Sequence, residues 1–157
     1  MTVVALSLWL VVAGGSQAVD ATLPAALRAQ VQTGRFDTVT SIRGLPLGVR
    51  DALQALFGSQ TLDIAEPGGD FQASGVIVDA MVPTRRLVAA GCSSDHYCIV
   101  YYQRRGNDPT WHVALFHWTP AATRCEWGGA APANLATIAD VRKVILSGGI
   151  KAPSMFW

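Results

Sequence analysis

Four strand-like segments joined by short turns occupy residues 85–128, and they constrain the fold more than any other feature of the chain. β-Branched and aromatic residues dominate the segments, while turn-forming Ser, Asp, Gly, Asn and Pro recur in the links. Links this short join antiparallel neighbours, because parallel strands need a crossover of roughly a dozen residues or more. We therefore expect a β-meander built from Arg85–Cys92, Tyr97–Arg104, Thr110–Trp118 and Thr123–Gly128.

Amphipathic helices are expected on both sides of this meander in the sequence, two before it and one, from about Ala133 to Leu146, after it. The expected starting and ending residues are Thr22 and Gly34 for the first helix, Pro46 and Gly58 for the second, and Asn134 and Gly148 for the third. A short strand is expected at Val76–Asp79, and Arg35–Gly44 is a loop or another short strand. The sequence thus predicts an α+β fold. It has an antiparallel β-meander of four to five strands, with two N-terminal helices and one C-terminal helix packed on one face of the sheet.

Pairing of the two central segments around the link 105–109 places Arg104 opposite Thr110. Side chains alternate along a strand, so this register divides the two segments between two faces. One face carries Tyr97, Ile99, Tyr101, Trp111, Val113, Leu115 and His117, and the other carries Cys98, Val100, Tyr102, Arg104, His112, Ala114, Phe116 and Trp118. Neither face is polar. The strands are therefore covered on both sides, or covered on one side and open as a binding face on the other.

The first 18 residues, MTVVALSLWLVVAGGSQA, are typical of an export signal. The apolar stretch Val3–Ala13 is followed by glycines and then by small residues at a cleavage site, although no Lys or Arg precedes Arg28. An uncleaved membrane anchor is the alternative, and it would be the chain's only association with a membrane. We expect residues 1–18 to be a signal peptide or anchor and residues 19–157 to form a single exported domain, periplasmic or secreted.

Three cysteines, Cys92, Cys98 and Cys125, are consistent with an oxidising compartment. If Cys92 lies opposite Cys98, a disulfide closes the hairpin between them, and Cys125 remains as a small buried apolar residue. A register with a four-residue turn would instead place Cys92 opposite Tyr97, and the two sulfur atoms would then point to different faces. We favour the Cys92–Cys98 disulfide.

Aromatic residues concentrate in the meander, where seven of the 13 lie between Tyr97 and Trp127. Rings on a sheet either fill the space beneath helices or form a platform for sugars, peptides or hydrophobic partners. The candidate binding residues are Tyr101, Tyr102, Trp111, His112 and Trp118. Arg85 and Arg86 are expected on a solvated strand edge, where at most one of them can reach a given anion.

Charge and motifs exclude several functional classes. A net charge of +1 gives no electrostatic basis for binding nucleic acid, and no cofactor fingerprint is present, so we expect neither nucleic acid nor a cofactor. The spacing Cys92-x3-His96-x-Cys98 matches no common zinc motif, and we expect no metal. A thiol site made of Cys92, His117 and Asp95 has no supporting local signature.

The function predicted from the sequence is a non-catalytic binding or interaction module whose partner is a protein or a cell-wall component. Two alternatives remain open. One is a small extracytoplasmic enzyme that uses a Cys/His site, and the other is a membrane-tethered subunit of an assembly.

Overall fold

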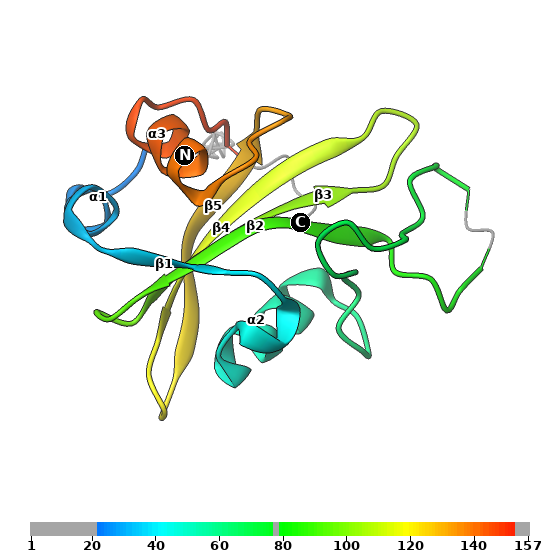
Figure 1. Ribbon diagram of the computed structural model, residues 1–157, viewed down its shortest axis with the longest axis horizontal. Coiled ribbons are helices and arrows are strands. Elements are labelled where there is room, and N and C mark those ends of the chain that lie inside the picture. The colour runs from blue at the N-terminus through cyan, green and yellow to red at the C-terminus, as the bar shows by residue number, and fades with distance from the viewer. Residues whose placement is uncertain (1–21, 77–78, 153–157) are drawn as a thin grey trace, which may run out of the picture.

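The computed structural model describes residues 22–76 and 79–152, and it has three helices and a five-stranded antiparallel sheet (Figure 1). In chain order the elements are α1 (Ala25–Thr33), β1 (Phe36–Val39), the short 3-10 helix η1 (Ile42–Gly44), α2 (Leu47–Phe57), β2 (Arg85–Ser93), β3 (Tyr97–Arg104), β4 (Thr110–Trp118), β5 (Thr123–Ala131) and α3 (Ile138–Leu146). The strands are hydrogen-bonded in sequence order, from β1 to β5. The predicted α+β fold is therefore confirmed. The expected leader, residues 1–18, lies outside the described residues.

The strands follow the sequence pattern closely. Both β3 and β4 have the expected bounds, whereas β2 is one residue longer and β5 continues to Ala131. The fifth strand is β1, which lies within the Arg35–Gly44 segment. The expected strand at Val76–Asp79 falls partly on residues 77–78, outside the described residues, and neither Val76 nor Asp79 belongs to a strand.

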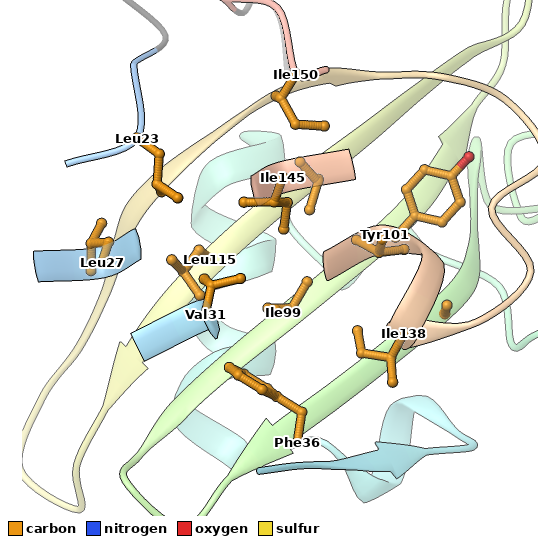
Figure 2. Packing of buried hydrophobic residues seen from close by; sticks show 13 residues of the cluster. Leu23, Leu27, Val31, Phe36, Ile99, Tyr101, Leu115, Ile138, Ile145 and Ile150 are labelled. Carbon is orange, nitrogen blue, oxygen red and sulfur yellow. The ribbon is translucent and has the colours of Figure 1, made fainter. Parts of the chain in front are cut away.

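Helices cover both faces of the sheet, which corrects the expectation that they pack on one face. As Figure 1 shows, α1 and α3 lie on one side and α2 lies on the other. Figure 2 shows Ile99, Tyr101 and Leu115 pointing from the sheet toward α1 and α3. The physical reason is that the central strands carry apolar side chains on both faces, and each face must be removed from water.

The two cores match the two faces expected from alternation. The buried residues under α1 and α3 include Leu27, Val31, Ile99, Tyr101, Val113, Leu115, Ile138, Val141 and Ile145. Those under α2 include Val49, Leu53, Leu87, Cys98, Val100, Tyr102, Ala114 and Phe116. We call the second of these surfaces the α2 face.

The residues that end the helices agree with the expected ones at Gly58 but differ at the starts of α1 and α3. Gly58 ends α2 in the left-handed conformation, with φ of 62°, as expected for a glycine at this position. The helix α3 begins later than expected, because Thr137 and Asp140 form a reciprocal capping box. Asn134, the expected cap, lies before the helix with φ of 64°. Thr22 does not cap α1, whose first turn is preceded by Pro24.

The cysteines occupy the register that favours a disulfide. Cys92 lies opposite Cys98, their Cα atoms are 4.1 Å apart, and their sulfur atoms are bonded. On β4, Phe116 has Cys98 on one side and Cys125 on the other, so Cys125 is separated from the pair by a whole strand. Cys125 is free and partly buried against the α2-face core.

A β-bulge in β2 changes which side chains face α2 beyond it. The pairs Cys92–Cys98 and Ala89–Tyr101 share one register, which would place Val88 opposite Tyr102. Leu87 lies opposite Tyr102 instead, so Val88 is an extra residue in β2. Beyond the bulge Arg85 lies opposite Arg104. Without the extra residue, continuing the disulfide register would place Arg86 there instead.

We predict that opening the disulfide lowers the stability of the domain. A ring this small should stabilise the fold by about 2 kcal/mol, mainly by restricting the unfolded chain. The free energy of unfolding in urea should fall by that amount when Cys92 and Cys98 are both replaced by serine. Cys125→Ser is the matched control, since it removes a thiol but no crosslink, and reductant should destabilise this control as it does the parent. An equal stability of oxidised and reduced protein would contradict the prediction.

Candidate functional site

Three arginines line a pocket where β2, the β3–β4 turn and the loop before β2 meet. The lining residues are Gly75, Thr84, Arg85, Arg104, Arg105 and Gly106, and the volume is about 290 Å³. No acidic residue belongs to this lining. We call this the arginine pocket.

The backbone pattern brings Arg85 and Arg104 close together. Thr84 bonds to β3, because its backbone O accepts from Arg105 N at 3.0 Å. The next residue bonds to the loop before β2: Arg85 O accepts from Ala65 N at 2.9 Å. Leu87 N donates to Ala65 O at 3.0 Å, on the same side. The backbone of Arg85 therefore bonds away from β3, so Arg85 and Arg104 are a non-hydrogen-bonded pair. Side chains approach each other most closely in pairs of this kind. Two positive side chains thus face each other across neighbouring strands.

Arg85 is buried and fixed, which corrects the expectation of a solvated strand edge. Only 6% of its surface is exposed, its Nη1 donates to Asp63 Oδ2 at 2.6 Å, and its guanidinium lies 4.1 Å from the centre of the Phe57 ring. Asp63 also accepts the backbone N–H of Thr84 at 2.6 Å and bonds the Thr84 hydroxyl. Burial lowers the pKa of Arg85, against the opposing effect of Asp63.

The other arginines differ in orientation. Arg105 reaches the loop before β2, where its Nη1 donates to Gly75 O at 3.2 Å. Arg86 is next to Arg85 but points the other way along the pleat, where it bonds Gln103 Oε1 at 2.8 Å and lies over Phe71.

Two predicted binding residues, Tyr102 and His112, adjoin the arginine pocket on the α2 face. Their rings stack with centroids 5.4 Å apart, and Tyr102 also contacts Phe57 edge-on at 5.2 Å. His112 Nε2 lies 3.0 Å from Thr110 Oγ1. Tyr102 is fully buried, and its hydroxyl has no hydrogen-bond partner among the described residues.

Electrostatics keep both rings uncharged at neutral pH. Burial lowers the pKa of His112 to about 4, with further contributions from Arg104 and Arg85. Burial also raises the pKa of Tyr102 well above its ordinary value. The positive charge beside the pocket therefore comes from arginine alone.

The remaining predicted residues lie elsewhere. Tyr101 is buried under α3, where its hydroxyl donates to Pro132 O at 2.7 Å, and burial raises its pKa to about 12. Trp111 packs, partly buried, against the same core. Trp118, at the other end of β4, borders a groove of about 510 Å³ beside the first turn of α2. The centres of the Trp118 and His96 rings are 5.0 Å apart. The structure thus brings together only two of the five.

The cysteines and histidines do not assemble a thiol site. Cys92 is bonded to Cys98 on the α2 face, whereas the His117 ring contacts Tyr97 at 4.9 Å on the opposite face. Burial raises the pKa of Cys125 to about 11, which disfavours its nucleophilic thiolate. Within residues 22–76 and 79–152, no group of three or more His, Cys, Asp or Glu residues is placed to hold a metal ion.

Sequence reasoning missed Asp63, Thr84 and Arg105. One signal was available, because Arg85-Arg86 and Arg104-Arg105 lie at the same end of the β2–β3 hairpin once its strands are paired. Asp63 had no comparable signal, since the loop that carries it has no periodic pattern.

Comparison with models of known protein families, with curated proteins and with solved structures finds no match. None of the helices in the described part of the chain is long and apolar enough to cross a membrane.

We predict that His112 makes the fold acid-sensitive. Its folded pKa of about 4 lies below the ordinary value of 6.5, so acid protonates the unfolded chain first. The contribution of His112 to the free energy of unfolding is fully present above pH 6.5 and is lost as the pH drops toward 4. Urea unfolding at pH 7 and pH 4.5 should show that the parent loses about 2 kcal/mol more than His112→Gln does. Equal losses in the two proteins would show that His112 is not the group responsible.

Proposed function

We propose that this chain is an exported, non-catalytic binding domain that takes an anionic ligand in the arginine pocket. The observation that carries the proposal is the direct pairing of Arg85 with Arg104 at a pocket also lined by Arg105. Like charges directly opposite each other destabilise a sheet. An anion bound between them would turn this repulsion into charge-assisted hydrogen bonds.

The environment of Arg85 supports a binding role. Asp63, Thr84 and Phe57 fix its guanidinium, so little rotamer entropy would be lost on binding. Guanidinium groups stay charged and present a planar fork that matches oxyanions. A fixed arginine at the base of a small pocket therefore favours recognition of a discrete anionic group over loose attraction to a charged surface.

The chemistry of the neighbouring groups favours binding over catalysis. His112 is uncharged at neutral pH and has a pKa of about 4, far below that of an efficient general base at pH 7. The free thiol of Cys125 has a raised pKa, and the other two cysteines are joined. The disulfide is also compatible with export, and the proposed carrier of the anion is a protein or a cell-wall component.

Arg104→Gln is the variant that tests this function. Arg85 is unsuitable, because its loss would leave Asp63 half-buried without its cation. Calorimetric titration with phosphate, sulfate, acetate and citrate should show binding to the parent that weakens at least tenfold in Arg104→Gln. The free energy of unfolding of this variant is measured beside the titration, so that a loss of binding counts only in a folded protein.

Arg35→Gln is the matched control. It removes the same charge from an exposed side chain next to β1, at the disulfide end of the sheet. It should bind anions as the parent does. The proposal fails if the parent binds none of the four anions, or if Arg104→Gln and Arg35→Gln bind them equally well.

A further inference from the structure

A groove of about 510 Å³ lies at the other end of β4 from the arginine pocket, and the proposed function does not use it. It is lined by residues 46–48, 51 and 52 at the start of α2, and by residues 118–123 from the end of β4 to the start of β5. Both α2 and the β4–β5 turn lie in the lower part of Figure 1. Because the groove contains Trp118, a binding residue predicted from the sequence, we call it the Trp118 groove.

Both walls of the Trp118 groove are fixed by the fold. Thr119 N donates to Ala122 O at 2.8 Å, and the Thr119 hydroxyl donates to the same oxygen at 3.1 Å, so the turn is closed by its own hydrogen bonds. On the other wall, a Cβ atom on Gly48 would clash with Thr123 Oγ1, so α2 and β5 lie against each other here. A groove with walls held in this way is largely pre-formed, and little ordering is needed when it binds a ligand.

The lining combines apolar surface with one charge. Leu47 is 64% exposed, and the Trp118 ring, which packs partly buried against the α2-face core, borders the groove. Among the described residues of the lining, Asp51 is the one that is charged. Its carboxylate is exposed and makes no ion pair or hydrogen bond with another described residue. An indole ring and a free carboxylate both attract a cation.

The spacing of side chains along α2 matches that of an extended chain. Leu47 and Asp51 are four positions apart, so they lie on one face of the helix and about 6 Å apart along its axis. In an extended segment, side chains two positions apart point to the same side and are about 6.6 Å apart. A segment that lies along α2 can therefore place one side chain against Leu47 and a second against Asp51 at the same time.

We propose that the Trp118 groove binds an extended segment of a partner protein in which an apolar residue and a lysine or arginine are two positions apart. The apolar side chain covers Leu47. The cationic group pairs with Asp51, while the aliphatic stem of the same side chain lies against the Trp118 ring. This site goes beyond the proposed anion binding and does not depend on it.

The test follows peptide binding to the intact oxidised protein through the indole N–H signal of Trp118 in proton–nitrogen correlation spectra, assigned by its loss in Trp118→Phe. The probe is acetyl-Gly-Leu-Ser-Lys-Gly-amide. One control peptide has norleucine in place of lysine, which removes the charge. The other, acetyl-Gly-Ser-Leu-Lys-Gly-amide, has the same composition, but its adjacent anchors point to opposite sides. The probe should shift the Trp118 signal and bind about fivefold more tightly than either control.

Two variants assign the preferences to side chains. Asp51→Asn should abolish the advantage of the probe over the norleucine peptide, because it removes the carboxylate and keeps its shape. Leu47→Gln should abolish the advantage over the peptide of the same composition. Asp37→Asn is the matched control and should retain both preferences, since it removes an exposed carboxylate from β1, at the opposite edge of the sheet from β5. Thermal unfolding checks that the variants remain folded, as expected for substitutions at exposed positions.

The proposal fails if the parent binds the lysine and norleucine peptides equally well, or if the preference for lysine survives in Asp51→Asn. Equal binding of the two peptides of the same composition would exclude an extended segment along α2. A Trp118 signal that no peptide shifts would also overturn the proposal, and a shift by a trimer of N-acetylglucosamine alone would assign the groove to a glycan. Arg104→Gln should bind the probe as the parent does, so this result and the anion titrations can fail separately.

Discussion

The register of β2 against β3 is the constraint on which the rest of the structure depends. At one end the Cys92–Cys98 bond joins the strands, and in the middle the extra residue Val88 shifts the pairing by one position. The arginine pocket lies at the other end, where this shift places Arg85 opposite Arg104. The disulfide and the bulge together therefore decide which of two adjacent arginines faces α2 and which faces away.

The second governing feature is that the sheet is apolar on both sides. It explains why α1 and α3 pack on one face while α2 packs on the other, and why Tyr101 and Tyr102, adjacent in sequence, lie in different cores. Both tyrosine rings are fully buried, so they fill the two cores. Of the five predicted binding residues, only Tyr102 and His112 adjoin the arginine pocket. A small domain buries such large rings efficiently, and each contributes a large share of the apolar area removed from water.

Much of this fold was predictable from local patterns. Alternation along Tyr97–Arg104 and Thr110–Trp118 gave the strand bounds, the pairing of Arg104 with Thr110 and the division into two faces. The distribution of helices between the faces was not predictable, because both faces are equally apolar and no periodic signal distinguishes them. The start of α3 was missed because Asn134 and Thr137 are both good caps, and only the reciprocal bond with Asp140 distinguishes them.

The candidate site was predictable only in part, and the reason is again physical. Pairing the hairpin brings the two arginine doublets to the same end, so a cluster of positive charge could have been inferred. The bulge has no sequence signature here, since Val88 is an ordinary strand residue, and without it the wrong arginine is assigned to the α2 face. The burial of Arg85 depends on Asp63, a carboxylate in an irregular loop 22 positions earlier in the chain.

The most direct test of this account is the register itself, measured by nuclear Overhauser effects between Hα protons in the oxidised protein. Non-hydrogen-bonded antiparallel pairs bring Hα protons close together. The account predicts a strong cross-peak between Hα of Arg85 and Hα of Arg104, together with one between Hα of Cys92 and Hα of Cys98. A cross-peak between Hα of Arg86 and Hα of Arg104 in its place would show that β2 has no bulge, and it would contradict the arginine pocket described above.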